Sequence, residues 1–225
     1  MDGVDVRRIP YEETYEWLMY KHYAHRMPSI SYAFGLYKNS IMVGVCTFGT
    51  PSSSTLRNGI LGEDLANRII ELNRLCVDCN QKNITSWFVS HCIKMLPKPI
   101  CIVSYADTEQ GHIGKIYQAC NFIYTGLSAK RTDWKIKGME HLHGQTIADM
   151  SRGHKNRAEY MREKYGSDFY LKERPRKHRY IYFTGSKKEV KEMRRALRYP
   201  ICDYPVGVTK RYDASYKPIT QGLLL

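Results

Sequence analysis

Long apolar runs are absent from this chain of 225 residues, and so is the opening that a secreted protein needs. No segment approaches the roughly 18 to 20 consecutive apolar residues of a membrane helix. The first residues, Met1 to Asp5, contain no basic stretch followed by an apolar one, which a signal peptide requires. We therefore expect a protein that has no membrane partner and works in the cytoplasm.

A framework of paired cysteines is also missing. The chain has seven cysteines, an odd number, and they stand in apolar surroundings, which favours reduced and buried thiols over disulfides. Cys76 and Cys79 form one C-x-x-C pair, but no second pair accompanies them. A zinc site at this pair is therefore the less favoured interpretation.

The composition is that of a folded protein with a real core. Hydrophobic residues make up 43% of the chain, aromatic residues 12% and charged residues 25%, which excludes disordered, collagen-like and coiled-coil classes. A chain of this length forms one large domain, or a core domain with an elaboration, but not two full-sized enzymes. We expect a single active site.

Excess acidic charge is found nowhere, and the formal net charge of +13 is concentrated in one region. Residues 1–127 hold 12 Lys and Arg against 11 Asp and Glu, whereas residues 128–212 hold 22 against 10, a net charge of +12. A concentrated basic surface attracts a polyanion through phosphate contacts and counterion release. The charge therefore favours a nucleic-acid partner over a generic solvated surface.

Aromatic residues are interleaved with this basic charge, notably over residues 174–180 and 194–199. Guanidinium groups bind phosphates and aromatic rings stack on bases, so the mixture is typical of a nucleic-acid surface. We predict contacts from twelve basic residues: Lys130, Arg131, Arg152, Lys155, Arg157, Arg174, Arg176, Lys177, Arg179, Arg194, Arg195 and Arg198.

The hydrophobic pattern predicts an α/β core that begins with a helix and a hairpin. Helices are expected over 11–24, 86–96 and 113–120, and strands over 31–37, 41–48, 68–77, 100–105 and 122–126. A further strand over 179–183 precedes a helix that starts at a capping box on Ser186. Residues 128–178 show no comparable pattern, so we interpret them as an insertion between neighbouring strands of one sheet.

Four segments follow from this pattern. We expect a catalytic core over 1–127, a basic DNA-binding insertion over 128–178, a closing strand and basic helix of the core over 179–212, and a C-terminal tail over 213–225. The pattern leaves the oligomeric state open.

Two sets of motifs carry a family resemblance. A strand (Glu71 to Val77), a polar turn, a helix, then Tyr105-Ala106-Asp107 and Gly114 to Phe122 resemble the GNAT acyltransferase core, a mixed sheet flanked by helices. Several motifs taken together, over roughly residues 11 to 212, resemble the phage Mom DNA-modification proteins. These motifs are His22-Tyr23-x-His25, Ser104 to Asp107, the series from Gly111 to Gly126, and the basic, Tyr-rich C-terminal part.

The Mom resemblance implies transfer of a methylcarbamoyl (acetamido-type) group to adenine N6 in double-stranded DNA, which protects phage DNA from host restriction. The location is then the host cytoplasm. The GNAT resemblance implies acetyl-CoA or another small acyl or aminoacyl donor. Cofactor contacts are expected from Cys76, Lys82, Asn83, Thr85, His112 and Asn121. One departure concerns the turn over 80–85, which has none of the glycines usual in GNAT proteins that bind coenzyme A.

Four residues are candidates for the chemistry. Asp107 stands where a buried strand ends, so it is a candidate base or partner of N6, and its alternative role is to cap the next turn. Tyr23 and Tyr117 are candidates to donate a proton, orient the donor or stack on an extruded base. Arg74, on a core strand, should meet a carboxylate, a phosphate or a developing oxyanion, with a structural pair to Glu71 or Asp107 as the alternative.

A metal site and two other functions stay open. His22 and His25, with Asp107 or His112, form a candidate set for iron or another metal, although the same residues equally serve proton transfer. One alternative function is a DNA-binding protein on a catalytically inactive GNAT scaffold. The other is an acyl- or aminoacyltransferase that acts on RNA or protein amines.

Overall fold

The computed structural model describes residues 3–51, 53–142 and 144–209 of the chain. The chain divides into two compact units. The core unit consists of Met1–Gly126 together with His178–Leu225, and the inserted unit is Leu127–Lys177. Each unit has its own sheet and its own buried cluster.

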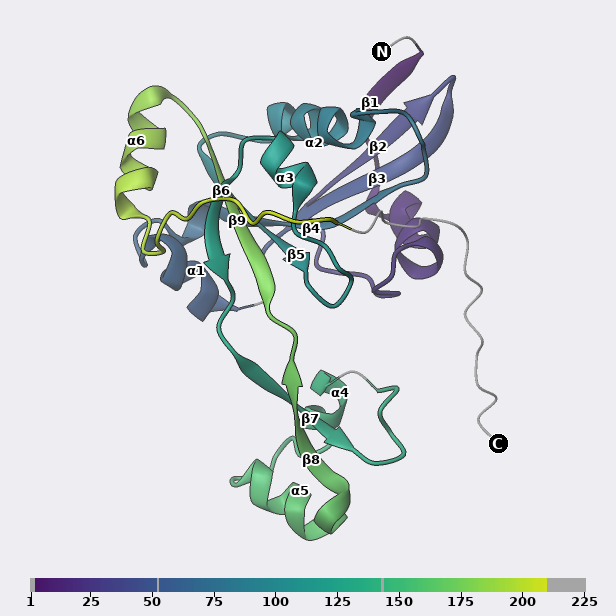
Figure 1. Ribbon diagram of the computed structural model, residues 1–225, viewed down its shortest axis with the longest axis vertical. Helices are drawn as coiled ribbons and strands as arrows, with labels where there is room; N and C mark the ends of the chain where they lie inside the picture. Colours follow the sequence, from purple (N-terminus) through teal and green to yellow (C-terminus); the bar gives the residue numbers. More distant parts are fainter. Residues whose placement is uncertain (1–2, 52, 143, 210–225) are drawn as a thin grey trace. The chain divides into compact units, whose positions relative to one another are not determined.

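The core unit is built on one sheet of seven strands in the order β1-β2-β3-β4-β5-β9-β6 (Figure 1). Strands β1 to β4 pair antiparallel in sequence, and β4 pairs parallel with β5. The predicted mixed sheet is confirmed, and so is an insertion between neighbouring strands, because β6 and β9 lie side by side. The bounds are β1 Val4–Arg8, β2 Tyr32–Lys38, β3 Ile41–Gly49, β4 Ile69–Val77, β5 Ile100–Asp107, β6 Ile123–Leu127 and β9 Lys177–Thr184.

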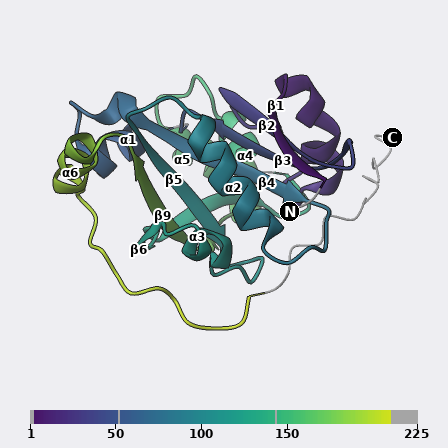
Figure 2. The ribbon, with the colours of Figure 1, turned by 90° about the horizontal axis from the view of Figure 1, so that it is seen from above.

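Helices cover both faces of this sheet because alternate strand residues are apolar toward each face. Ile102 of β5 packs in the cluster that contains Phe88 of α2, whereas its neighbour Val103 packs with Met193 of α6. Figure 2 shows α2 against the strands. The helices are α1 Ser54–Leu61, α2 Ile84–Met95, α3 Lys115–Ala119 and α6 Lys187–Ala196, with a short 3-10 turn over Ala66–Arg68. In the part of the chain that the structure describes, no helix combines the length and apolarity needed to span a membrane.

Three elements differ from the sequence-based expectation. The first helix consists of a 3-10 turn, Tyr11–Thr14, and a π turn, Trp17–Lys21, and it ends earlier than expected because His22 is extended. Strand β1 was not predicted, since its sequence is short and polar. Helix α1 was not predicted either: it starts in a loop rich in Gly, Ser and Pro, where the Ser53 side chain accepts from the Leu56 N–H at 3.2 Å.

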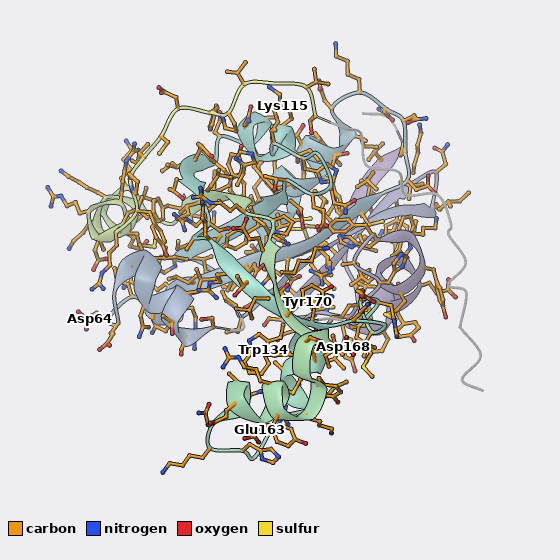
Figure 3. All side chains as sticks on the ribbon, turned by 60° about the horizontal axis from the view of Figure 1, so that its bottom comes forward. Asp64, Lys115, Trp134, Glu163, Asp168 and Tyr170 are labelled. Atoms are coloured by element: carbon orange, nitrogen blue, oxygen red, sulfur yellow. The ribbon has the colours of Figure 1, made fainter. Side chains whose placement is uncertain are left out.

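The inserted unit is a two-stranded antiparallel ribbon that packs against two short helices. Strands β7 (Arg131–Ile136) and β8 (Phe169–Arg174) form the ribbon, and α4 (Gly144–Asp149) and α5 (Arg157–Tyr165) lie between them in sequence. A 3-10 turn over Gly166–Asp168 leads into β8. Figure 3 labels Trp134 on β7, Tyr170 on β8 and Glu163 on α5. The core is small: Ile136, Ile147 and Met161 are its buried residues.

Candidate functional site

The parallel ladder between β4 and β5 ends before the strands do. It pairs β4 residues up to Leu72 with β5 residues up to Ser104, while β4 runs on to Val77 and β5 to Asp107. At the last pair, the Ser104 hydroxyl donates to the Leu72 carbonyl oxygen at 2.9 Å. Past this point β4 and β5 no longer pair with each other, although β4 continues to pair with β3.

A bulge in β4 decides where Arg74 lies. The ladder with β3 skips Asn73, which is therefore an extra residue in β4. Leu72 and Leu75 both pack in the cluster under α2, although residues three apart in a regular strand face opposite ways. The bulge thus reverses the alternation, and Arg74 shares the opposite face with Cys76, which packs in another cluster.

Four of the predicted site residues come together where β4 and β5 part. Arg74 and Asp107 both act electrostatically on Tyr23, and Asp107 also acts on His112. The rings of Tyr23 and His112 meet edge to face, with centroids 6.3 Å apart. We call Tyr23, Arg74, Asp107 and His112 the strand-end cluster. It joins three segments that are far apart in sequence, since Asp107 and His112 are only five residues apart.

Burial sets the protonation of this cluster. It raises the pKa of Tyr23 to about 12, an effect that Asp107 increases and Arg74 opposes. It lowers the pKa of Arg74, which Tyr23 and Glu71 oppose. It also lowers the pKa of His112, against the effect of Asp107. At neutral pH, Tyr23 therefore keeps its proton and His112 is mainly neutral.

Asp107 has the capping role that was given as its alternative. Its Oδ1 accepts a hydrogen bond from the Glu109 backbone N–H at 3.0 Å, and only 8% of the residue is exposed. An ionised carboxylate offers about four acceptor positions on two oxygens. Capping therefore leaves Asp107 the capacity to bind a substrate N–H as well.

Tyr117 reaches the same strand end from α3. Its hydroxyl is hydrogen-bonded with Ser104, and Tyr23 acts on it electrostatically. Burial raises the pKa of Tyr117 well above the ordinary tyrosine value, and the Ser104 hydrogen bond opposes this only in part. Tyr117 is thus a protonated donor at neutral pH, anchored at the point where the ladder ends.

The turn over 80–85, which contains the predicted cofactor contacts Lys82, Asn83 and Thr85, leads into the start of α2. Asn83 takes φ +63° and ψ 0°, a left-handed conformation for which glycine is the usual residue. Within the described residues, its side chain makes no capping hydrogen bond to the first helical turn, which contains Thr85. Lys82 and Asn83 are exposed. This helix start fits an anionic group such as a pyrophosphate, although the turn has no glycine.

The other predicted cofactor residues are scattered. Cys76 is fully buried in the cluster that contains Trp17 and Leu18, so its thiol belongs to the core. Asn121 is exposed after α3, with φ +60°. His112 lies in the strand-end cluster. The six predicted cofactor residues are therefore divided among the turn before α2, a buried cluster, the position after α3 and the strand-end cluster.

The structure corrects the prediction that His22 and His25 belong to a metal site. His22 is buried, its Nδ1 accepts from a backbone N–H at 3.0 Å, and its ring stacks on Tyr23 at 4.5 Å. Nδ1 of His25 donates to a backbone carbonyl at 2.7 Å. Among residues 3–51, 53–142 and 144–209, no three His, Cys, Asp or Glu side chains are grouped as a metal site requires. His22 supports Tyr23 instead.

The structure also corrects the prediction that Arg179 contacts nucleic acid. It is buried, its Nε and Nη2 donate to the hydroxyl and carbonyl oxygens of Thr125 at 2.9 Å each, and its guanidinium lies 3.3 Å from the Tyr199 ring centroid. Two further arginines make structural hydrogen bonds: Arg176 donates to the carbonyls of Leu127 and Ser128, and Arg157 donates to the Ala148 carbonyl and the Ser151 hydroxyl. Their guanidiniums brace the fold.

The remaining predicted contacts lie in both units. Arg152 is exposed but pairs with Asp149 at 2.9 Å. Lys177 is half-buried at the start of β9, and Arg198 lies against Gly62. The others are exposed, and no side-chain hydrogen bond or ion pair joins them to another described residue: Lys130, Arg131, Lys155 and Arg174 in the inserted unit, and Arg194 and Arg195 on α6.

Two residues that matter here were not among the predicted site residues. Ser104 bridges the end of the ladder and Tyr117, and Asn73 forms the bulge, held by the Thr47 hydroxyl at 2.6 Å and the Ser29 carbonyl at 2.8 Å. The signal for Asn73 is present in the sequence, because Asn73-Arg74 interrupts an otherwise apolar strand. Ser104 likewise stands in an apolar strand and belongs to the Ser104 to Asp107 motif, but the sequence favours a strand residue there over a functional one.

The family profile of the Mom proteins matches residues 3–206. This chain belongs to the Mom protein family. The methylcarbamoylase Mom of Escherichia phage Mu is 30% identical to it over 139 residues, which are 59% of this chain and 57% of that protein. The match thus spans a little over half the length of that relative.

Solved structures of acetyltransferases are also similar to the chain. An N-acetyltransferase from Staphylococcus aureus Mu50 has a TM-score of 0.43 and 15% identity, over 81% of this chain and 99% of that one. The putative acetyltransferase YncA from Salmonella typhimurium, solved with acetyl-CoA, has a TM-score of 0.44 and 10% identity, over 82% and 96%.

Proposed function

We propose that this Mom-family protein transfers a methylcarbamoyl (acetamido-type) group to adenine N6 in double-stranded DNA and so protects phage DNA from host restriction. The observation that carries the proposal is the strand-end cluster, in which Tyr23, Arg74, Asp107 and His112 meet where β4 and β5 part. The phage Mu relative is a methylcarbamoylase by name, which supports the identity of the transferred group.

The acceptor sets the first demand on the site. Adenine N6 is a poor nucleophile because its lone pair is delocalised into the ring, so it must be positioned closely and lose a proton. During transfer, N6 forms a bond to a carbon of the donor. The bond from that carbon to its leaving group breaks, the electron pair leaves with that group, and one N6 proton passes to a base. We assign the N6 contact to Asp107, whose carboxylate has acceptor capacity beyond the Glu109 bond.

The protonated tyrosines meet the second demand, a proton for the leaving group. Burial keeps the protons on Tyr23 and Tyr117 at neutral pH. Tyr117 is held by Ser104 at the end of the ladder, so we assign it the donation to the leaving group. Tyr23 stands beside Asp107, and we assign it the orientation of the base or of the donor.

Arg74 stabilises negative charge in this scheme. Its Nη1 donates to the Asn73 carbonyl at 2.7 Å, while its Nε is buried and has no hydrogen-bond partner among the described residues. A buried N–H without a partner costs free energy, roughly 1–3 kcal/mol. An oxygen that becomes negative during transfer would satisfy it.

The residues at the start of α2 fit a donor that carries a pyrophosphate, such as an acyl-CoA. Lys82, Asn83 and Thr85 would hold the phosphates, and when bound the group would supply an activated carbon and a thiol leaving group. An acetyl group contains no nitrogen, so acetyl-CoA alone cannot supply a methylcarbamoyl group. An aminoacyl donor carries that nitrogen, but attack of N6 on its carbonyl carbon would give an N6-aminoacyl group, the isomer of the methylcarbamoyl group. The methylcarbamoyl linkage needs a donor whose leaving group is on the methylene carbon, because that carbon becomes bonded to N6.

Nucleoside mass spectrometry of DNA from cells that express the protein tests the proposal. We expect an adenine nucleoside heavier than deoxyadenosine by one methylcarbamoyl substituent. Asp107→Asn should lower its yield by at least about 100-fold, because the amide keeps the oxygen that accepts from Glu109 but loses the base. Tyr117→Phe should also abolish it. Asp64→Asn and Tyr11→Phe, both at exposed residues, are the matched controls.

Three outcomes would contradict the proposal. Unmodified DNA from cells with abundant, DNA-binding protein would indicate an inactive scaffold. A modified RNA nucleoside or protein amine, with DNA unchanged, would indicate a different acceptor. Full modification by Asp107→Asn or Tyr117→Phe would return that residue to its structural role.

A further inference from the structure

The register of the β7–β8 ribbon separates its two faces. Residues that are directly paired point to the same side, and successive residues alternate. Trp134, Ile136 and Phe169 pack in the cluster with α4 and α5. Their neighbours therefore point away from that cluster: Arg131, Asp133 and Lys135 on β7, and Tyr170, Lys172 and Arg174 on β8.

One end of this outer face is already occupied. Lys135 Nζ donates to the carbonyls of Glu140 at 3.0 Å and Leu142 at 2.8 Å, so the chain after β7 folds over that end. Asp133 lies against Gly144, where an added Cβ would come within 3.0 Å of its side chain. The open part consists of Arg131, Lys172, Arg174 and Tyr170, which are all exposed. We call these four residues the ribbon face.

The ribbon face contains a local conflict. Arg131 and Arg174 are direct cross-strand partners, and like charges placed opposite each other destabilise a sheet. Within residues 3–51, 53–142 and 144–209, neither arginine forms an ion pair, and Glu173, the neighbour of Arg174, points to the other side with Thr132. A phosphate between the two guanidiniums would turn this repulsion into two charge-assisted contacts.

We propose that the ribbon face binds the phosphate backbone of double-stranded DNA. The inference rests on the proposed function, since it names the surface that holds the same substrate. A two-stranded ribbon is narrow enough to follow a groove of B-DNA, and the exposed Tyr170 ring adds contact area beside the cations. Among the described residues, the side chains of the ribbon-face arginines make no hydrogen bond, unlike those of Arg157, Arg176 and Arg179.

The test is the salt dependence of duplex binding by the full chain, measured with one DNA duplex and Arg131→Gln/Arg174→Gln. Each lost phosphate contact removes about 0.9 from the slope of log affinity against log salt, so the slope should fall by about 1.8. Affinity should fall at least about tenfold at 0.1 M salt. The melting temperature should stay equal or rise, because the repulsion is removed. Lys94→Gln/Lys98→Gln removes the same charge from exposed core-unit positions and should leave the slope unchanged.

Further variants keep the test decisive. Arg131→Lys/Arg174→Lys keeps the charge and should keep most of the slope. If the glutamine variant melts early, Lys172→Gln replaces it, with an expected loss of about 0.9. An unchanged slope in a folded variant, while the wild type binds and modifies DNA, overturns the ribbon face alone. A wild type that neither binds nor modifies DNA overturns the proposed function. Equal loss of affinity for an RNA duplex overturns the assignment to DNA.

Discussion

The core unit and the inserted unit differ in the size of their buried clusters and in the density of their basic charge. The core unit holds three buried clusters around a seven-stranded sheet, whereas the inserted unit buries Ile136, Ile147 and Met161 beside a two-stranded ribbon. The inserted unit has 13 Lys and Arg against 7 Asp and Glu in 51 residues. The rest of the chain has 22 against 15, so its net charge of +7 is spread over 174 residues, against +6 over 51.

This difference is what the proposed function would require of each unit. Transfer chemistry needs side chains fixed to within fractions of an ångström, which only a large, well-packed core provides. Phosphate binding needs charge at a surface and tolerates small movements. A small core with a dense basic surface is therefore suited to hold a polyanion, and the strand-end cluster lies in the unit that can hold it still.

The largest expected effect comes from Ile147→Ala in α4 of the inserted unit. Ile147 is fully buried, and such a truncation costs about 2–5 kcal/mol, comparable to the whole stability of so small a core. In hydrogen exchange with mass spectrometry, amides of β7, β8, α4 and α5 should lose protection while those of β5 keep it. Ile102→Val in β5 is the control for a core-unit cavity. If both units lost protection together, they would form one cooperative unit.

A second contrast lies within one basic run. Arg179→Gln removes two hydrogen bonds to Thr125 and the contact with Tyr199, so unfolding in urea should show a loss of about 2–3 kcal/mol. Arg174→Gln, at an exposed ribbon position, should change stability by less than about 0.5 kcal/mol and lower DNA affinity instead. Equal stability losses would contradict the division of this run into buried and exposed parts.

Removing one helix cap in each unit should cause a smaller loss of stability, of similar size in both units. The Ser186 side chain accepts from the Glu189 N–H, and Glu189 accepts in return, whereas Asn156 caps α5 through its side chain alone. Ser186→Ala and Asn156→Ala should each cost about 1 kcal/mol. The first should lower global stability in urea, and the second should appear as faster exchange within the inserted unit. Ser54→Ala, at an exposed position of α1, is the control.

The smallest effect concerns pH in the core unit. Burial lowers the pKa of His112 below 6.5, so between its folded pKa and 6.5 the unfolded chain binds more protons than the folded one. Stability should therefore fall as pH drops below 6.5, by less than about 1 kcal/mol because the imidazole is partly exposed. Urea unfolding at pH 7.5 and 5.5 should show a smaller difference for His112→Asn than for the wild type. An equal difference would remove His112 as the source.

Most of the core-unit elements were predictable because their patterns are local. The hairpin of β2 and β3, strands β4 and β5, and α2 follow from runs of apolar residues, and the capping box at Ser186 is present as expected. The candidates Arg74 and Asp107 stand on core strands, where polar residues in apolar surroundings are visible in the sequence, whereas Tyr23 and Tyr117 were singled out mainly by the family resemblance. Strand β1, helix α1 and the elements of the inserted unit were not predicted because short, largely polar segments form them.

The sequence by itself determined the basic region, the α/β order and the polar residues that stand out from the core pattern, because charge and periodicity are properties of neighbours in the chain. Only the tertiary structure decided which of these residues meet. Arg179 and Arg174 belong to the same basic run, yet one is buried on Thr125 and the other is exposed, since strand alternation and the start of β9 separate them. Likewise the bulge at Asn73 reverses the facing of Arg74, and no local pattern records the partner strand that makes it a bulge.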